Sequence, residues 1–154
     1  MSRADIVAEA RSWIGTPYRH QASCKGVGTD CLGLLRGIWR AAYGHEPERA
    51  PPYTPNWTED TKQDTLLLAA RRYLIEIPMG ACQPGDVLLF RMGLGLPAKH
   101  CAIVSERGRI IHAYWGRAVC ETRLVPWWER RIAGAFRFPG PDGADLPHRT
   151  DTSL

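Results

Sequence analysis

One cysteine stands where a thiol can become a nucleophile. Residues 28–37 read GTDCLGLLRG, in which Asp30 is a suitable N-cap and Cys31 opens an apolar run with helical spacing. At a helix N-terminus, unpaired backbone N–H groups and the positive end of the helix dipole favour the thiolate over the thiol. The stretch therefore indicates that Cys31 is a nucleophile, with a metal ligand and an inert buried thiol as the alternatives.

Two histidines are spaced so that they could activate such a nucleophile. His100 lies in KHCAIV and His112 in RIIHAYW, two expected strands joined by SERGR. A hairpin with a three-residue connection at 105–107 places these residues directly opposite each other on one face, with Cβ atoms about 4.5–5.5 Å apart. One imidazole can then accept the thiol proton while the other holds its tautomer. We expect Cys31 and His100 to meet as a thiolate–imidazolium pair.

The residues around the cysteine also suggest a site for an oxyanion. If the helix that begins at Cys31 packs on the sheet, its first backbone N–H points at the oxyanion that forms when the thiolate attacks a carbonyl. Tyr18, in the preceding loop, offers a hydroxyl that could complete this site. The simpler interpretations are that Tyr18 is a packing residue and that His112 is a core histidine.

Metal binding is the rival chemistry. Cys24, Cys31, Cys101 and His100 could gather around zinc, but the sequence has no CxxC pair and no HxxxH, which are the short spacings of structural zinc sites. The five cysteines are widely and irregularly spaced, unlike a disulfide framework, so we expect reduced thiols. Cys101 points to the other side of its strand from His100 and is expected in the core.

The elements that must position these residues follow from the hydrophobic spacing. Helices are expected over 3–14, 31–43 and about 61–75, and strands near 86–91, 99–104, 109–115, 119–124 and 132–138, with a proline-rich loop at 45–60. Gly33 and Gly37, one turn apart, indicate a helix face that another backbone approaches closely. The helices come first along the chain and a meander of strands follows. This order predicts an α+β domain with helices on one side of an antiparallel sheet. We expect one domain over residues 1–138 and a disordered tail over 139–154.

The composition excludes several classes of protein. The 154 residues are 44% hydrophobic and 23% charged with a net charge of +4, which is ordinary for a soluble globular protein. No basic cluster alternates with aromatic residues, so we expect no nucleic-acid partner. No stretch approaches the roughly 18 apolar residues of a membrane helix, and the N-terminus MSRADIVAEARSW is amphipathic, unlike a secretory signal. We expect a protein made in the cytoplasm without a signal peptide and not inserted in a membrane.

Five motifs, in order, resemble those of the NlpC/P60 cysteine peptidases, and most of all their phage-associated cell wall peptidase branch. They are GTPYRHQ, GTDCLGLL, QPGDVLLF, KHCAIV and GRIIHAYW, and the resemblance spans roughly residues 3–138. It implies a papain-like α+β fold in which N-terminal helices pack on a small antiparallel sheet.

The resemblance also implies roles for single residues. Cys31 would be the nucleophile, His100 the general base and His112 the orienting residue. Tyr18 would help to form the cleft and orient the thiol, and Asp30 would contact the free amino end of a peptidoglycan stem peptide. The implied reaction is hydrolysis of the bond between γ-D-glutamate and the diamino acid of the stem, through a thioacyl intermediate, with no metal and no organic cofactor.

Two departures from the family pattern leave alternatives open. Many members carry Ser directly after the nucleophile, where this chain has Leu32, which cannot hydrogen-bond. The sequence shows no LysM, SH3-like or signal segment, so targeting is expected to come from a phage or phage-derived tail with tail proteins as partners, or from release to the cell wall. The alternatives are a non-catalytic tail assembly or docking protein that keeps the fold, and an amidase or acyl transferase that uses the same site.

Overall fold

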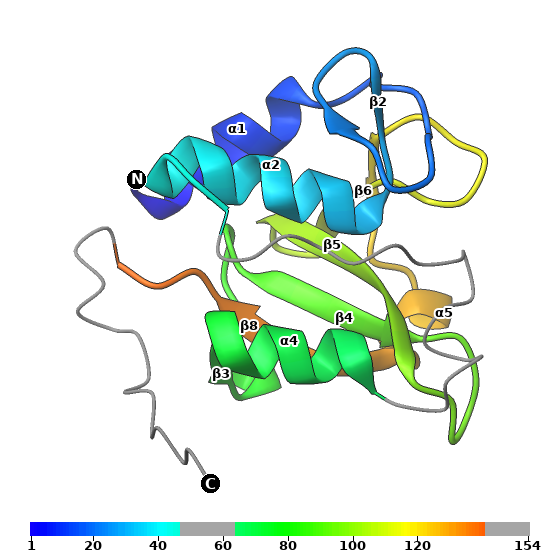
Figure 1. Cartoon of the computed structure of the whole chain (residues 1–154). Coiled ribbons are helices and arrows are strands. Elements are labelled where there is room, and N and C mark those ends of the chain that lie inside the picture. The colour runs from blue at the N-terminus through cyan, green and yellow to red at the C-terminus, as the bar shows by residue number, and fades with distance from the viewer. Residues whose placement is uncertain (47–63, 141–154) are drawn as a thin grey trace, which may run out of the picture.

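The fold is that of a computed structural model, in which residues 1–46 and 64–140 are described (Figure 1). The expected loop 45–60 and tail 139–154 lie almost entirely outside the described residues. The elements are α1 (Arg3–Ser12), β1 (Ser23–Cys24), β2 (Gly28–Thr29), α2 (Cys31–Tyr43), α4 (Thr65–Tyr73), β3 (Ile75–Ile77), η1 (Met79–Ala81), β4 (Val87–Arg91), β5 (Ala98–Glu106), β6 (Arg109–His112), β7 (Cys120–Arg123), α5 (Pro126–Glu129) and β8 (Ile132–Arg137).

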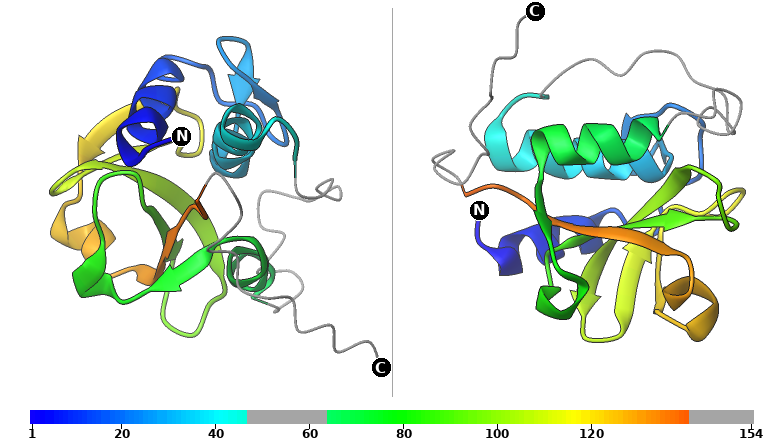
Figure 2. Two further views of the ribbon diagram at one scale, coloured as in Figure 1. Left: turned by 90° about the vertical axis from the view of Figure 1, so that its left-hand side faces the viewer. Right: turned by 90° about the horizontal axis from the view of Figure 1, so that it is seen from below.

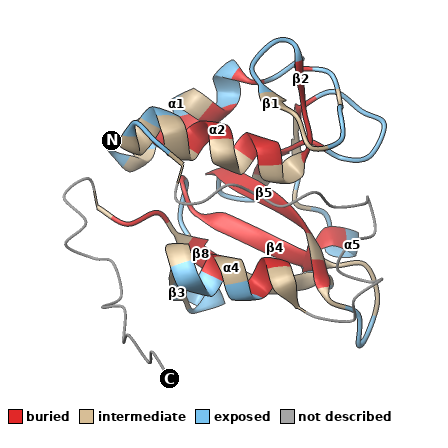
Figure 3. Cartoon of the chain, in the orientation of Figure 1, coloured by how far each residue is buried: buried red, intermediate tan, exposed pale blue. Residues whose placement is uncertain are grey.

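Six antiparallel strands form the main sheet, in the order β3-β8-β4-β5-β6-β7. The strands from β4 to β7 form the expected meander. The prediction is wrong for β8, which returns across the sheet and pairs between β3 and β4. The buried strand β4 needs hydrogen-bonding partners along both edges, and β8 supplies the second one. Figure 3 shows β4 and β5 buried at the centre of the molecule.

The sheet carries a cluster of buried apolar side chains on each face, because successive strand residues point to opposite sides. On one face the helices α1, α2 and α4 pack against the strands through Ile6, Ala10, Leu34, Ile38, Leu67, Leu89, Ile103 and Ile111. On the other face Trp128 of α5 packs with Leu88, Phe90, Val104 and Ile110. Figure 2 shows α5 on the far side of the sheet from α2. The α+β prediction is confirmed, and the short α5 is an addition to it.

Helix α2 begins and ends where the sequence predicts. The Asp30 carboxylate accepts a hydrogen bond from the Gly33 N–H at 2.7 Å and caps the N-terminus. Gly44 ends the helix with a φ of 80°, a left-handed conformation that glycine adopts without steric cost. Cys31 is thus held in the first turn.

Gly33 allows the preceding loop to lie against this first turn. An added Cβ would lie 1.9 Å from the Ala22 carbonyl oxygen and 2.6 Å from the Thr29 Oγ1. The predicted close approach of another backbone is therefore confirmed at Gly33. At Gly37 the close neighbour is a side chain instead, the indole of Trp13, 2.0 Å from an added Cβ.

Replacing Gly33 is expected to disturb this contact. Gly33→Ala should lower the free energy of unfolding by about 1–3 kcal/mol, because overpacking a tight contact costs that much. The matched control is Gly80→Ala, where an added Cβ meets nothing within 4 Å, and a change of at most about 0.5 kcal/mol is expected. Urea unfolding followed by circular dichroism measures both, and equal stabilities for the two variants would contradict the close contact.

Candidate active site

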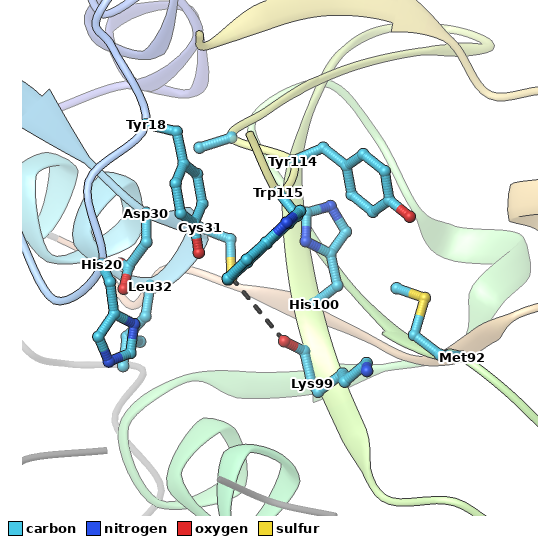
Figure 4. Close-up of a pocket in the computed structure, with 11 residues that line it drawn as sticks. Tyr18, His20, Asp30, Cys31, Leu32, Met92, Lys99, His100, Tyr114 and Trp115 are labelled. Carbon is cyan, nitrogen blue, oxygen red and sulfur yellow. Dashed lines mark hydrogen bonds between the residues drawn. The ribbon is translucent and has the colours of Figure 1, made fainter. Parts of the chain in front are cut away.

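A cleft of about 380 Å³ opens at the N-terminus of α2 (Figure 4). Its walls come from the loop before α2, from the first turn of that helix, from β5 and from the segment after β6. Four of the five residues that the sequence singled out line it: Tyr18, Asp30, Cys31 and His100. The fifth, His112, lies behind His100 on the neighbouring strand.

Cys31 faces β5 at an irregular point of that strand. Its Sγ lies 3.9 Å from the carbonyl oxygen of Lys99, the contact dashed in Figure 4. The pairing of β4 with β5 skips Lys99, since Phe90 pairs with His100 and the next residue of β4 pairs with Ala98. A bulge of this kind bends a strand and takes one residue out of the ladder. The Lys99 carbonyl, at this bulge, is the one that lies beside the thiol.

The surroundings of Cys31 favour its thiolate. Hydrogen bonding from the Cys101 thiol, with the hydrogen bond and charge of His100, lowers the pKa of Cys31 to about 5 against the opposing effect of burial. The N-terminus of α2 acts in the same direction. The pKa of Cys101 moves well above its ordinary value, because the neighbouring Cys31 and burial both disfavour a second thiolate. These surroundings favour the thiolate at Cys31 and the thiol at Cys101, which is buried in the core as expected.

The two histidines are in hydrogen-bonding contact, although not in the predicted register. The Nε2 atom of His100 lies 2.9 Å from the Nδ1 atom of His112. Ile103 pairs with Ile111, so His112 lies diagonally across from His100 and not directly opposite. The hairpin turns at 107–108 instead of over 105–107, and a bulge at position 105 shifts the pairing beyond the turn by one residue. Together these two features place the observed pairing two residues away from the expected one. Because a shift of two keeps every side chain on its face, the imidazoles still meet.

Aromatic rings enclose the two imidazoles. The Trp128 ring centroid lies 5.1 Å from that of His100 and 5.3 Å from that of His112, and Phe90 and Tyr114 lie 5.7 and 5.6 Å from His100. Both histidines are buried. Burial first, and the charge of His100 second, lower the pKa of His112 to about 3. His112 is therefore neutral and offers one N–H donor and one acceptor nitrogen.

His112 makes one further side-chain contact, which the sequence does not predict. Its Nε2 atom lies 3.0 Å from the Oγ1 atom of Thr122 on β7. His112 pairs with Cys120 across β6 and β7, so Thr122 lies one step further along the same face. The sequence predicts a strand at 119–124, but it does not give the register against β6 that brings Thr122 to His112.

Tyr18 lies beside the thiol. Figure 4 shows its hydroxyl directed toward Cys31, and a backbone bridge to Thr29 ties its loop to the start of α2. Burial raises the pKa of Tyr18 to about 12, and the charges of Cys31 and Asp30 act in the same direction. The hydroxyl therefore stays protonated and remains a hydrogen-bond donor.

The buried Asp30 carboxylate holds the loop and the helix together. Its oxygens accept hydrogen bonds from the backbone N–H of Gly33 at 2.7 Å and of Gln21 at 2.8 Å. Gln21 adopts a left-handed φ of 63°, which is unusual for a residue other than glycine. The carboxylate thus has a structural task in addition to placing a negative charge at the wall of the cleft.

Among residues 1–46 and 64–140, no group of three or more His, Cys, Asp or Glu side chains is placed to hold a metal ion. Within the same ranges no helix has the length and apolar character needed to cross a membrane.

A cysteine at a helix start that shares a cleft with a histidine of an antiparallel sheet is the arrangement of a papain-like α+β domain. The model of the NlpC/P60 family matches residues 15–137, and the chain belongs to this family. The resemblance of the five sequence motifs to the NlpC/P60 family is thereby confirmed.

Three relatives show how much of the chain is shared. Gamma-DL-glutamyl hydrolase of Bacillus subtilis (strain 168) is 27% identical over 134 residues, which are 86% of this chain and 29% of that protein. "Probable endopeptidase NlpC" of Escherichia coli (strain K12) is 24% identical over 136 residues, 88% of this chain and 77% of that protein. Tail tip assembly protein K of Escherichia phage lambda is 28% identical over 109 residues, 71% of this chain and 53% of that protein. The chain therefore spans less than a third of the first relative and about half of the third.

Solved structures agree on the fold. The NlpC/p60 domain of the peptidoglycan hydrolase SagA superposes with a TM-score of 0.64 at 25% identity, covering 90% of this chain and 100% of that one. RipD of Mycobacterium tuberculosis, described as a non-catalytic NlpC/p60 domain protein adapted to peptidoglycan binding, superposes with a TM-score of 0.54 at 15% identity, covering 89% and 97%. The same fold is thus found in a hydrolase and in a protein without catalysis.

The lowered pKa of Cys31 predicts alkylation at acidic pH. Iodoacetamide reacts with the thiolate, so the rate at Cys31 should be constant at neutral pH and fall to half near pH 5. For free N-acetylcysteine the pH of half-maximal alkylation lies near the ordinary pKa of a thiol, about 8.5. Mass spectrometry of peptides from timed, quenched reactions measures the rate, with the exposed Cys24 as an internal control for accessibility. A half-maximal rate at Cys31 near that of N-acetylcysteine would contradict an activated thiol.

Proposed function

We propose that this chain is a cysteine peptidase that hydrolyses peptidoglycan stem peptides at the bond between γ-D-glutamate and the diamino acid. The observation that carries the proposal is the Cys31 thiol, with a pKa lowered to about 5, in one cleft with His100. Membership of the NlpC/P60 family supports the class of reaction. Relatives named as a γ-DL-glutamyl hydrolase and an endopeptidase support the choice of bond.

In the first half of the reaction the thiolate of Cys31 attacks the carbonyl carbon of the γ-D-glutamyl bond. His100 holds the proton that the thiol has given up. The oxyanion that forms accepts hydrogen bonds from the first free N–H of α2, that of Cys31, and from the Tyr18 hydroxyl. The carbon–nitrogen bond then breaks, His100 gives its proton to the leaving amine, and a thioester remains on Cys31.

In the second half a water molecule replaces the amine. His100, now neutral, takes a proton from the water, whose oxygen attacks the thioester carbonyl. The carbon–sulfur bond breaks, the carboxylic acid leaves, and the proton on His100 restores the ion pair with Cys31. His112 stays neutral throughout, because burial lowers its pKa to about 3, and it acts by orienting His100.

The recognition of the stem is proposed to differ from that of members with Ser after the nucleophile. Leu32 lines the cleft next to Asp30 and supplies no hydrogen bond. The charge of Asp30 remains to attract an ammonium group, but its oxygens already hold Gly33 and Gln21. We therefore expect weak preference for a stem with a free amino end.

The place of action is proposed to be a phage or phage-derived tail. The support is the likeness to a tail tip assembly protein over 71% of this chain. A tail that carries a peptidase can open the wall locally during delivery of DNA, and other tail proteins are then its partners.

A second candidate function is a non-catalytic docking or assembly protein. It is favoured by Leu32 and by RipD, a protein of the same fold that is described as non-catalytic. An amidase or acyl transferase with the same nucleophile is a further alternative, which differs only in the bond that is broken or formed.

Incubation with purified muropeptides separates these functions. The wild-type chain is expected to release fragments with a new γ-D-glutamyl carboxyl end and a new amine on the diamino acid, identified by mass spectrometry. Cys31→Ala should abolish this cleavage while its thermal unfolding remains close to that of the wild type, since the change removes one sulfur atom. Cleavage retained by Cys31→Ala would exclude the mechanism, no cleavage by the wild type would favour docking, and cleavage elsewhere would favour an amidase.

The role of Leu32 can be tested by adding the missing hydroxyl. Leu32→Ser should raise kcat/KM about tenfold for a stem tripeptide with a free amino end relative to the N-acetylated tripeptide, because a hydrogen bond to a charged group contributes about 1.5–3 kcal/mol. Leu32→Ala is the matched control, since it removes the same side chain and adds no hydroxyl. Equal effects of the two variants on both substrates would show that position 32 does not read the amino end.

A further inference from the structure

The chain of hydrogen bonds that starts at the candidate base does not end at His112. His100 Nε2 lies 2.9 Å from His112 Nδ1, and His112 Nε2 lies 3.0 Å from Thr122 Oγ1. The three side chains come from three consecutive strands, β5, β6 and β7. A second cavity of about 460 Å³ is lined by both His112 and Thr122, and it shares Tyr114 with the cleft of Cys31.

The protonation state of His100 determines which atom donates and which accepts in each of these hydrogen bonds. When His100 is the imidazolium partner of a thiolate, both of its ring nitrogens carry hydrogen. Its Nε2–H can donate only if His112 Nδ1 is an acceptor, and a neutral His112 then carries its hydrogen on Nε2. That N–H is buried, and the atom placed to accept from it is Thr122 Oγ1.

The opposite direction of hydrogen bonding, from Thr122 through His112 to His100, would prevent His100 from acting as the base. If Thr122 donated to His112 Nε2, the hydrogen of His112 would sit on Nδ1 and donate to His100 Nε2. Neutral His100 would then carry its own hydrogen on Nδ1, the nitrogen left for Cys31, and could not take the thiol proton. A hydroxyl that accepts from His112 is thus needed for the working tautomer of both rings.

We propose that Thr122 is a positioning residue that accepts a hydrogen bond from His112 Nε2–H and so fixes the tautomer in which His100 presents a free Nδ1 to Cys31. The proposal rests on the proposed peptidase function, since it assigns Thr122 a task in the same site. Thr122 touches neither the thiol nor the cleft and acts through His112. Four other titratable or charged residues line the cavity beside it: Tyr114, Arg117, Cys120 and Arg123.

Two variants at this position separate the hydroxyl from the shape of the side chain. Thr122→Val keeps the shape and removes the acceptor, whereas Thr122→Ser keeps the acceptor. Arg123→Ala, at an exposed neighbouring position of β7, controls for changes to the strand. On a muropeptide substrate Thr122→Val should lower kcat roughly 10- to 100-fold, a part of what general acid–base catalysis contributes, with KM unchanged. Thr122→Ser and Arg123→Ala should remain close to wild type.

Two further measurements do not depend on peptide cleavage. The pH at half-maximal alkylation of Cys31 by iodoacetamide should rise by about one unit in Thr122→Val, because the His100 imidazolium loses the hydrogen-bond acceptor that Thr122 orients through His112. At a pH well below that midpoint, such a rise is about a tenfold loss of thiolate. Long-range ¹H–¹⁵N spectra of the histidine rings should show the hydrogen of His112 on Nε2 in the wild type and in Thr122→Ser, but not in Thr122→Val.

These readouts distinguish the two proposals. If the wild type cleaves muropeptides and Thr122→Val matches it in kcat, alkylation and tautomer, the role of Thr122 is refuted and the peptidase function stands. If the wild type cleaves nothing, the tautomer and the alkylation profile still decide the role of Thr122. Should Thr122→Val fail to fold, the wild-type spectrum decides alone, since a hydrogen on Nδ1 of His112 would overturn the proposal.

Discussion

The contact between the N-terminus of α2 and strand β5 is the constraint on which the site depends. A slide of α2 by one turn, about 5.4 Å, would take the thiol out of reach of the strand. The Asp30 carboxylate opposes this by bonding the backbone of both Gly33 and Gln21. The absence of a side chain at Gly33 lets the loop close on the helix. On the opposite side the Cys101 Sγ lies 3.2 Å from the carbonyl oxygen of Cys31.

The ionisable groups of the site lie partly at the open cleft and partly in the buried interior. Cys31 borders the cleft, which His100 also lines. His112 is 3% exposed, and burial keeps its ring neutral. Trp128 packs against both imidazoles and limits their rotation. A neutral ring that is held in this way can direct a hydrogen bond without competing for the proton.

The parts of the cleft differ in how they are supported. Cys31 lies on a helix and the two imidazoles lie on paired strands, whose positions are fixed by the core. Tyr18 and His20 come from the loop before α2, where one side chain can change without altering the sheet. The same fold is found in the peptidoglycan hydrolase SagA and in RipD, which is described as non-catalytic.

The sequence by itself determined the local features: the bounds of α2, its caps at Asp30 and Gly44, and the face shared by His100 and His112. These depend on side-chain periodicity and on capping within a few residues. Tertiary structure decided the hairpin register, through the turn at 107–108 and the bulge at position 105. It also decided the return of β8 beside β4 and the meeting of Thr122 with His112. The pairing of β8 with β4 brings together residues far apart in the chain. The register of each strand pair is settled by the packing of the whole sheet, which no local pattern encodes.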